Sequence, residues 1–92
     1  MTNLLHRFTK AAKIVSSDNA PIRESVYGAY RDYLSNIISE DLPEKIQIIY
    51  ESVTDRLTSI EPLGDIGVDE ASYLAKDILY MAHAVQAHYK KP

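Results

Sequence analysis

The sequence predicts an all-α protein, a single-domain antiparallel up-and-down four-helix bundle that spans residues 1–92. Apolar side chains recur with helical spacing along nearly the whole chain, and no stretch alternates as a β-strand does. Short connections separate these periodic stretches, which makes successive helices antiparallel. A length of 92 residues with 46% apolar and 25% charged side chains fits one globular domain.

The first helix is expected at about residues 3–17 and the second at about residues 21–39. Thr2 or Asn3 can cap the first helix with a side-chain oxygen. Pro21 suits the first turn of the second helix, where its missing N–H would have no partner anyway. Each helix has one apolar stripe, formed by Leu4, Leu5, Phe8, Ala11, Ala12 and Val15 in the first and by Ile22, Val26, Tyr30, Tyr33, Leu34 and Ile37 in the second.

The third helix is expected at about residues 43–60 and the fourth at about residues 69–90, with the loop EPLGDIGVD between them. Asp41 is the expected cap of the third helix, and Pro43 fits its first turn. Ile48 faces away from the apolar stripe of this helix and is expected to be exposed. The stripes consist of Ile46, Ile49, Tyr50, Val53, Leu57 and Ile60 in the third helix and of Leu74, Ile78, Met81, Val85 and Tyr89 in the fourth.

The composition excludes several classes of chemistry. The chain has no cysteine, so it has no disulfide, thiolate zinc site or cysteine nucleophile. Its apolar runs are too short for a membrane span. A net charge of −3 is unfavourable for nucleic acid binding, although His6, Lys10 and Lys13 share one face of the first helix. We therefore expect a soluble, cytoplasmic protein.

Metal and catalytic sites are not expected either. His83 and His88 are five residues apart, so a helix turns their side chains well over a right angle from each other. The sequence has no Glu-x-x-His pair of the kind that holds two metal ions inside helical bundles. The acidic pairs at residues 40–41 and 69–70 lie at helix starts, where the helix dipole favours carboxylates. We expect no metal, no cofactor and no enzymatic activity.

The segment AHAVQA is similar to the phosphorylation site of histidine phosphotransfer domains, which are small helical bundles. In that family an exposed histidine is followed, after two residues, by a lysine. Here Ala84 and Val85 follow His83, but Gln86 stands where the lysine would be, and the motif lies on the last helix. The resemblance covers about five residues. It implies an alternative function, a phosphoryl carrier that uses His83. A separate alternative is a small-ligand carrier with a pocket between helices that is lined by tyrosines.

The face of the fourth helix that points away from the core carries Tyr73, Lys76, Tyr80, Ala84 and Ala87. Glutamate and lysine usually fill a helix face that meets only water. Tyrosine and alanine favour contact instead, because tyrosine is common in interfaces and alanine allows close approach. We expect a non-enzymatic protein–protein interaction or regulatory protein, of the inhibitor, immunity or adaptor type. Through this face it would bind a protein partner or a second copy as a homodimer, unless the face is covered inside the monomer.

Overall fold

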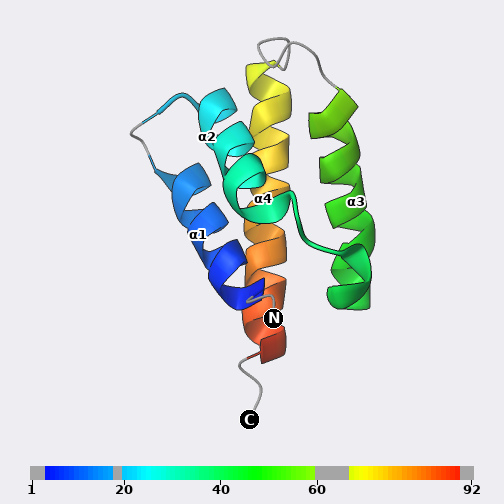
Figure 1. The fold of residues 1–92 in the computed structure, drawn as a ribbon. Coiled ribbons are helices and arrows are strands. Elements are labelled where there is room, and N and C mark those ends of the chain that lie inside the picture. The colour runs from blue at the N-terminus through cyan, green and yellow to red at the C-terminus, as the bar shows by residue number, and fades with distance from the viewer. Residues whose placement is uncertain (1–3, 18–19, 60–66, 90–92) are drawn as a thin grey trace.

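The chain folds into four antiparallel α-helices, which confirms the predicted all-α bundle (Figure 1). The computed structural model describes residues 4–17, 20–59 and 67–89. The chain runs up the first helix, down the second, up the third and down the fourth. The α-helices are α1 (Leu4–Ser16), α2 (Ile22–Ala29), α3 (Glu44–Ser59) and α4 (Val68–Tyr89). The expected caps Thr2 and Asn3, the predicted core residue Ile60 and most of the predicted loop lie outside the described residues.

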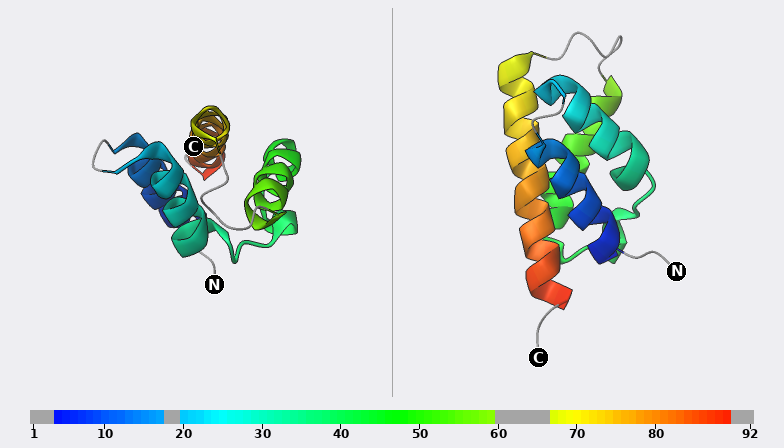
Figure 2. Two further views of the ribbon diagram at one scale, coloured as in Figure 1. Left: turned by 90° about the horizontal axis from the view of Figure 1, so that it is seen from above. Right: turned by 90° about the vertical axis from the view of Figure 1, so that its left-hand side faces the viewer.

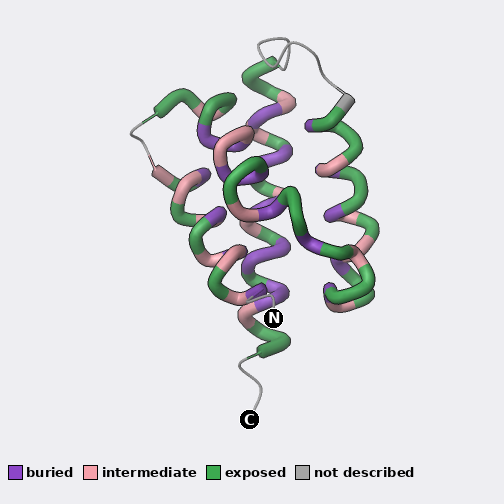
Figure 3. The backbone as a smooth tube through the Cα atoms, in the orientation of Figure 1, coloured by how far each residue is buried: buried purple, intermediate pink, exposed green. Residues whose placement is uncertain are grey.

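α4 is the helix around which the others are arranged. It contacts α1, α2 and α3. Seen from above, α1 and α2 lie on one side of α4 and α3 lies on the other (Figure 2, left). Buried positions recur along all four helices and in the segment between α2 and α3 (Figure 3). The largest fully buried side chains come from every helix and from the segment after α2, and they are Phe8, Val26, Leu34, Ile46, Val53, Ile78, Met81 and Val85.

The apolar stripe of α1 packs as its spacing predicts. Leu4, Phe8, Ala11 and Val15 are all buried, and each lies three or four residues from the next. That spacing keeps them on one face of a helix. Burial of a large apolar side chain such as Phe8 contributes about 1.5–3 kcal/mol. The outer face of α1 carries His6, Lys10 and Lys13, and all three are exposed.

The second predicted helix is wrong in its second half. α2 ends at Ala29 and continues only as a π-helical turn, η1 (Tyr30–Leu34). The Ser35 N–H donates to the Tyr30 carbonyl at 2.8 Å, the i to i+5 bond that defines such a turn. The chain then leaves the helix and forms a short 3-10 turn, η2 (Ser39–Asp41), before α3. The sequence had predicted one continuous helix to residue 39.

This helix ends early because distant side chains bind the carbonyls at its end. The Tyr50 hydroxyl of α3 donates to the Leu34 carbonyl at 2.5 Å and to the Ile37 carbonyl at 2.9 Å. Arg7 of α1 donates from Nη1 to the Tyr33 carbonyl at 3.3 Å. Terminal carbonyls need partners from outside the helix, and these two side chains supply them. Apolar periodicity contains no sign of these partners, which lie at least 13 residues away in the sequence.

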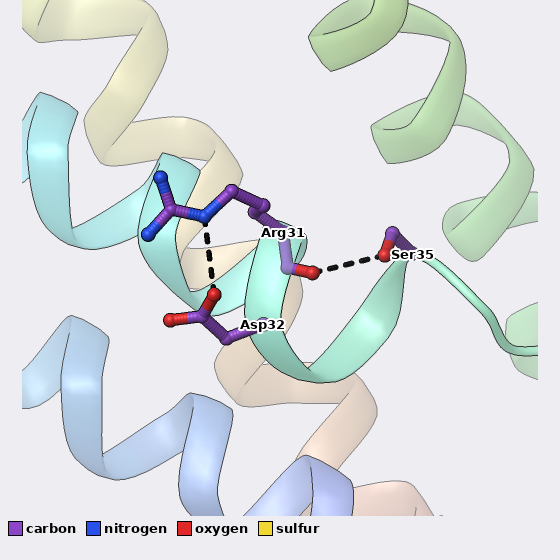
Figure 4. A network of polar contacts seen from close by, with 3 residues as sticks. All are labelled: Arg31, Asp32 and Ser35. Atoms are coloured by element: carbon purple, nitrogen blue, oxygen red, sulfur yellow. Dashed lines mark hydrogen bonds and ion pairs between the residues drawn. The ribbon is translucent and has the colours of Figure 1, made fainter.

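Local polar contacts occur on the outside of the π-helical turn (Figure 4). Arg31 donates from Nε to Oδ1 of Asp32 at 3.1 Å, and Ser35 donates from Oγ to the Arg31 carbonyl at 3.0 Å. The Arg31 guanidinium also lies 5.5 Å from the centre of the Tyr27 ring. Both side chains of the ion pair are more than half exposed, so the pair adds little stability.

α3 begins later than its expected cap. Asp41 lies in η2, three residues before the start of α3, so its predicted role as the adjacent cap is wrong. Pro43 precedes the helix instead, and its carbonyl accepts the Ile46 N–H at 3.0 Å. The Gln47 side chain reaches back and donates to the Leu42 carbonyl at 2.9 Å. These bonds turn the chain from η2 into α3 and replace the predicted cap.

Candidate interaction surface

α4 is buried over most of its circumference. The reason is its position, because α1 and α2 cover one side of the helix and α3 covers another. A helix with neighbours on two sides needs a wider apolar arc than one that faces a single neighbour. Its buried residues are Ala71, Leu74, Ala75, Ile78, Met81, Ala82, Ala84 and Val85.

Four of the five residues predicted to form a contact surface are exposed. Tyr73 is 67% exposed and Tyr80 is 52% exposed, and Lys76 and Ala87 are exposed on the same side of α4. The Lys76 ammonium lies 5.6 Å from the centre of the Tyr73 ring, within the range of a cation–π contact. These four residues are named the α4 outer face below.

Ala84 is the exception, and its prediction is wrong. Only 7% of Ala84 is exposed, so it belongs to the core. It lies at the edge of the buried arc, where the start of α3 approaches the end of α4 and both line one pocket. A helical wheel gives the direction of Ala84 from the predicted core stripe, but it does not show that α3 would lie in that direction. Ala84 therefore packs against α3 inside the monomer, in the wall of that pocket, and is not an exposed residue of the outer face as predicted.

Tyr89 shows the opposite error. Its wheel position places it in the core stripe, but it is 51% exposed. The end of α4 extends past the ends of the neighbouring helices (Figure 1), so no helix in the described part of the chain covers the side of this turn that carries Tyr89. The ring of His88 meets that of Tyr89 edge-on at 5.0 Å, a contact between sequence neighbours.

An ion pair and a pocket mark the two ends of the contact between α3 and α4. An ion pair joins Arg56 of α3 to Glu70 of α4 at one end. At the other end lies an open pocket of about 380 Å³. The pocket is formed by the first residues of α3 and the last turns of α4, and its lining consists of Pro43, Glu44, Lys45, Ala84, Ala87 and His88.

The alternative function drew on His83 and on a tyrosine-lined pocket. His83 is exposed, as its wheel position predicts, and so is His88. No tyrosine lines the pocket between α3 and α4, and the Tyr50 hydroxyl is bound to backbone carbonyls. In residues 4–17, 20–59 and 67–89, no three His, Asp or Glu side chains are grouped as a metal site would require. In the described residues, His83 and the tyrosines are therefore not brought together in one site.

Two further features bear on this surface. Ile48 is 78% exposed on α3, as its wheel position predicts. Asp77 of α4 is half-buried, and burial raises the pKa of its carboxyl group above the ordinary value. Asp77 could not be singled out from the sequence, because a lone acid on an amphipathic helix gives no signal before the position of α3 is known.

None of the helices in the described part of the chain is both long and apolar enough to cross a lipid bilayer. No protein-family model, curated protein or solved structure matches the chain. A function is therefore inferred from the chemistry of the surface itself.

Proposed function

We propose that this chain is a non-enzymatic protein–protein interaction protein of a regulatory or adaptor kind, whose contact surface is the α4 outer face. One observation carries the proposal. Tyr73 and Tyr80 are more than half exposed on a helix that is buried around most of its circumference. They are seven residues apart, which places them two turns apart on one side of the helix.

The chemistry of these residues suits a protein contact. A tyrosine ring has a large apolar area, and its hydroxyl tolerates water until a partner covers it. Tyrosine is enriched in the centres of interfaces and is frequent among the residues that dominate binding energy. Ala87 continues the face with a small side chain, which allows close approach of a second element. Lys76 adds a positive charge beside Tyr73.

A photo-cross-linking residue tests the proposal in cells that express the chain. Tyr80 is replaced by p-benzoylphenylalanine, which keeps an aromatic side chain at that position. Tyr89 provides a matched control, because its exposure of 51% equals that of Tyr80 within one per cent. It lies nine residues further along α4, and so points about 180° away at about 100° per residue.

We expect irradiation to give a discrete higher-mass adduct with the probe at position 80 and none with the probe at position 89. An adduct at both positions would show non-specific contact, and no adduct at position 80 would show that this face has no partner. Either of these two results overturns the proposal. Far-UV circular dichroism checks that both probe variants retain the helical fold.

A further inference from the structure

The outer side of α3 extends the α4 outer face. Arg56 and Glu70 form an ion pair between α3 and α4, and because the Arg56 side chain is 53% exposed, the pair lies at the outer edge of the contact between these helices. At about 100° per residue, Ile48 lies about 80° round α3 from Arg56, and Tyr80 lies about 80° round α4 from Glu70 in the same rotational sense. Each rotation is counted along its own helix, from the N-terminus to the C-terminus. Because α3 and α4 are antiparallel, equal rotations counted in this way turn Ile48 and Tyr80 toward the same side of the helix pair. Ile48, which is 78% exposed, therefore joins Tyr80 on one surface.

Ile48 also lies near the level of Tyr80 along the bundle. The ion pair fixes the register of the two antiparallel helices at one end, and the shared pocket fixes it at the other. Between these two points, one residue along α3 corresponds to one residue back along α4, since both helices rise about 1.5 Å per residue. The surface thus has an apolar centre, made of Tyr80 and Ile48, that spans both helices.

The pocket and Tyr73 lie at equal distances from this centre. Ala87, in the pocket wall, is exposed and follows Tyr80 by seven residues, whereas Tyr73 precedes Tyr80 by seven. Each is therefore about 10.5 Å from Tyr80 along the helix axis. Tyr73 is also rotated from Tyr80 toward Glu70, which is the side of α4 on which α3 and the pocket lie.

We propose that the partner of this surface is a second copy of the chain, an inference that rests on the proposed function. The two copies of α4 cross antiparallel about a two-fold axis beside Tyr80. This axis is perpendicular to α4 and points from α4 toward α3. A rotation of 180° about it reverses the direction of α4 but leaves α3 on the same side. Tyr73 of one copy therefore stays on the α3 side and lies at the level of Ala87 in the other copy. Each Tyr73 ring then enters the pocket of the partner subunit, and the contact is reciprocal, as two-fold symmetry requires.

Repulsion between like charges disfavours a parallel pairing. The Lys76 ammonium lies beside Tyr73 in its own chain and would move with that ring toward Glu44 of the partner subunit, which lines the pocket. In a parallel pairing, Lys76 would face its own copy, and like charges would repel each other. Lys45 and His88 also line the pocket, so Lys76 would meet one acidic and one basic side chain there, and the tyrosine hydroxyl would have a polar setting.

The molecule is large enough for such an interface. Its principal extents are 41 × 26 × 22 Å. Stable interfaces bury about 800 Å² on each partner. A surface of these dimensions can supply that area, and its most exposed apolar side chains, Ile48 and Tyr73, both lie within the proposed contact.

The first test measures mass against concentration. Sedimentation velocity of the full chain should show a monomer–dimer equilibrium. Tyr73→Ala should raise the dissociation constant about 30-fold, the effect of losing a residue that dominates binding. Tyr89→Ala, the matched control, should leave it unchanged. A monomer at every concentration overturns the proposal, as does an equal effect of the two substitutions.

The second test determines the orientation. The chain has no cysteine, so Lys76→Cys and His83→Cys each introduce a single thiol. Lys76 precedes Tyr80 by four residues and His83 follows it by three, so the antiparallel pairing brings these positions together. Mild oxidation of the mixed variants should give mainly the mixed disulfide. Disulfides mainly between like variants would indicate a parallel pairing and overturn the proposed arrangement.

The cross-linking experiment at Tyr80 separates this inference from the proposed function. An adduct of twice the mass of the chain supports both. An adduct with a different protein, together with a monomer in sedimentation, supports the proposed function and overturns the second copy as its partner. No adduct at all overturns both.

Discussion

The Tyr50 hydroxyl joins α3 to the end of η1, so Tyr50→Phe removes one defined link. Tyr50 is 5% exposed, and its ring remains in the variant. The Leu34 carbonyl keeps the Ile37 N–H as a donor at 3.3 Å, whereas the Ile37 carbonyl loses the hydroxyl at 2.9 Å. Loss of a buried hydrogen bond that leaves an acceptor unsatisfied costs about 1–3 kcal/mol. For a domain of this size, each kcal/mol lowers the melting temperature by about 4–8 °C.

Thermal and urea unfolding followed by circular dichroism measure this cost. Tyr30→Phe is the matched control, because Tyr30 is also buried, at 7% exposure, and donates no hydrogen bond to another described residue. We expect the control to change the free energy of unfolding by less than about 0.5 kcal/mol. If Tyr50→Phe were as mild as the control, the hydroxyl would not hold η1 in place, and the reason given for the early end of the second helix would fail.

Three other substitutions, one of them a control, test the burial assigned on α4. Ala84→Glu should destabilise the monomer by about 1–3 kcal/mol because it places a carboxylate in the core, whereas Ala87→Glu, three residues away on the surface, should cost little in dilute urea unfolding. Equal effects would contradict the burial of Ala84. Burial raises the pKa of Asp77, so the folded state binds more protons and stability falls as pH rises from about 3.8 through the higher folded pKa. Asp77→Asn should therefore raise the melting temperature at pH 7, and a pH-independent difference between the two proteins would contradict this origin.

The fold could be predicted from the sequence wherever one helix faces one core. The stripes of the first, third and fourth helices predict α1, α3 and α4 closely, because apolar spacing alone determines which side of each helix is buried. The second helix could not be predicted to its end. Its last turns depend on Tyr50 and Arg7, which bind its carbonyls from α3 and α1. Such bonds exist only after the fold has brought these segments together.

The candidate surface could be predicted in part for a related reason. Wheel positions place Tyr73 and Tyr80 away from the core correctly. They fail for Ala84 and Tyr89, because burial there depends on which helices lie alongside and on how far those helices extend. A wheel gives the direction of a side chain but contains no information about the length or position of the neighbours.

The position of α3 also limits the part of α4 that can serve as a contact surface. With Ala84 buried, the exposed arc of α4 between residues 69 and 87 runs from His83 to Tyr73 and spans about 80° at 100° per residue. Tyr80 lies within this narrow arc, and both tyrosines are more than half exposed, so the core does not depend on them. Changes at these two positions should therefore leave the free energy of unfolding nearly unchanged. Any loss of association that they cause can then be assigned to the contact surface and not to the fold.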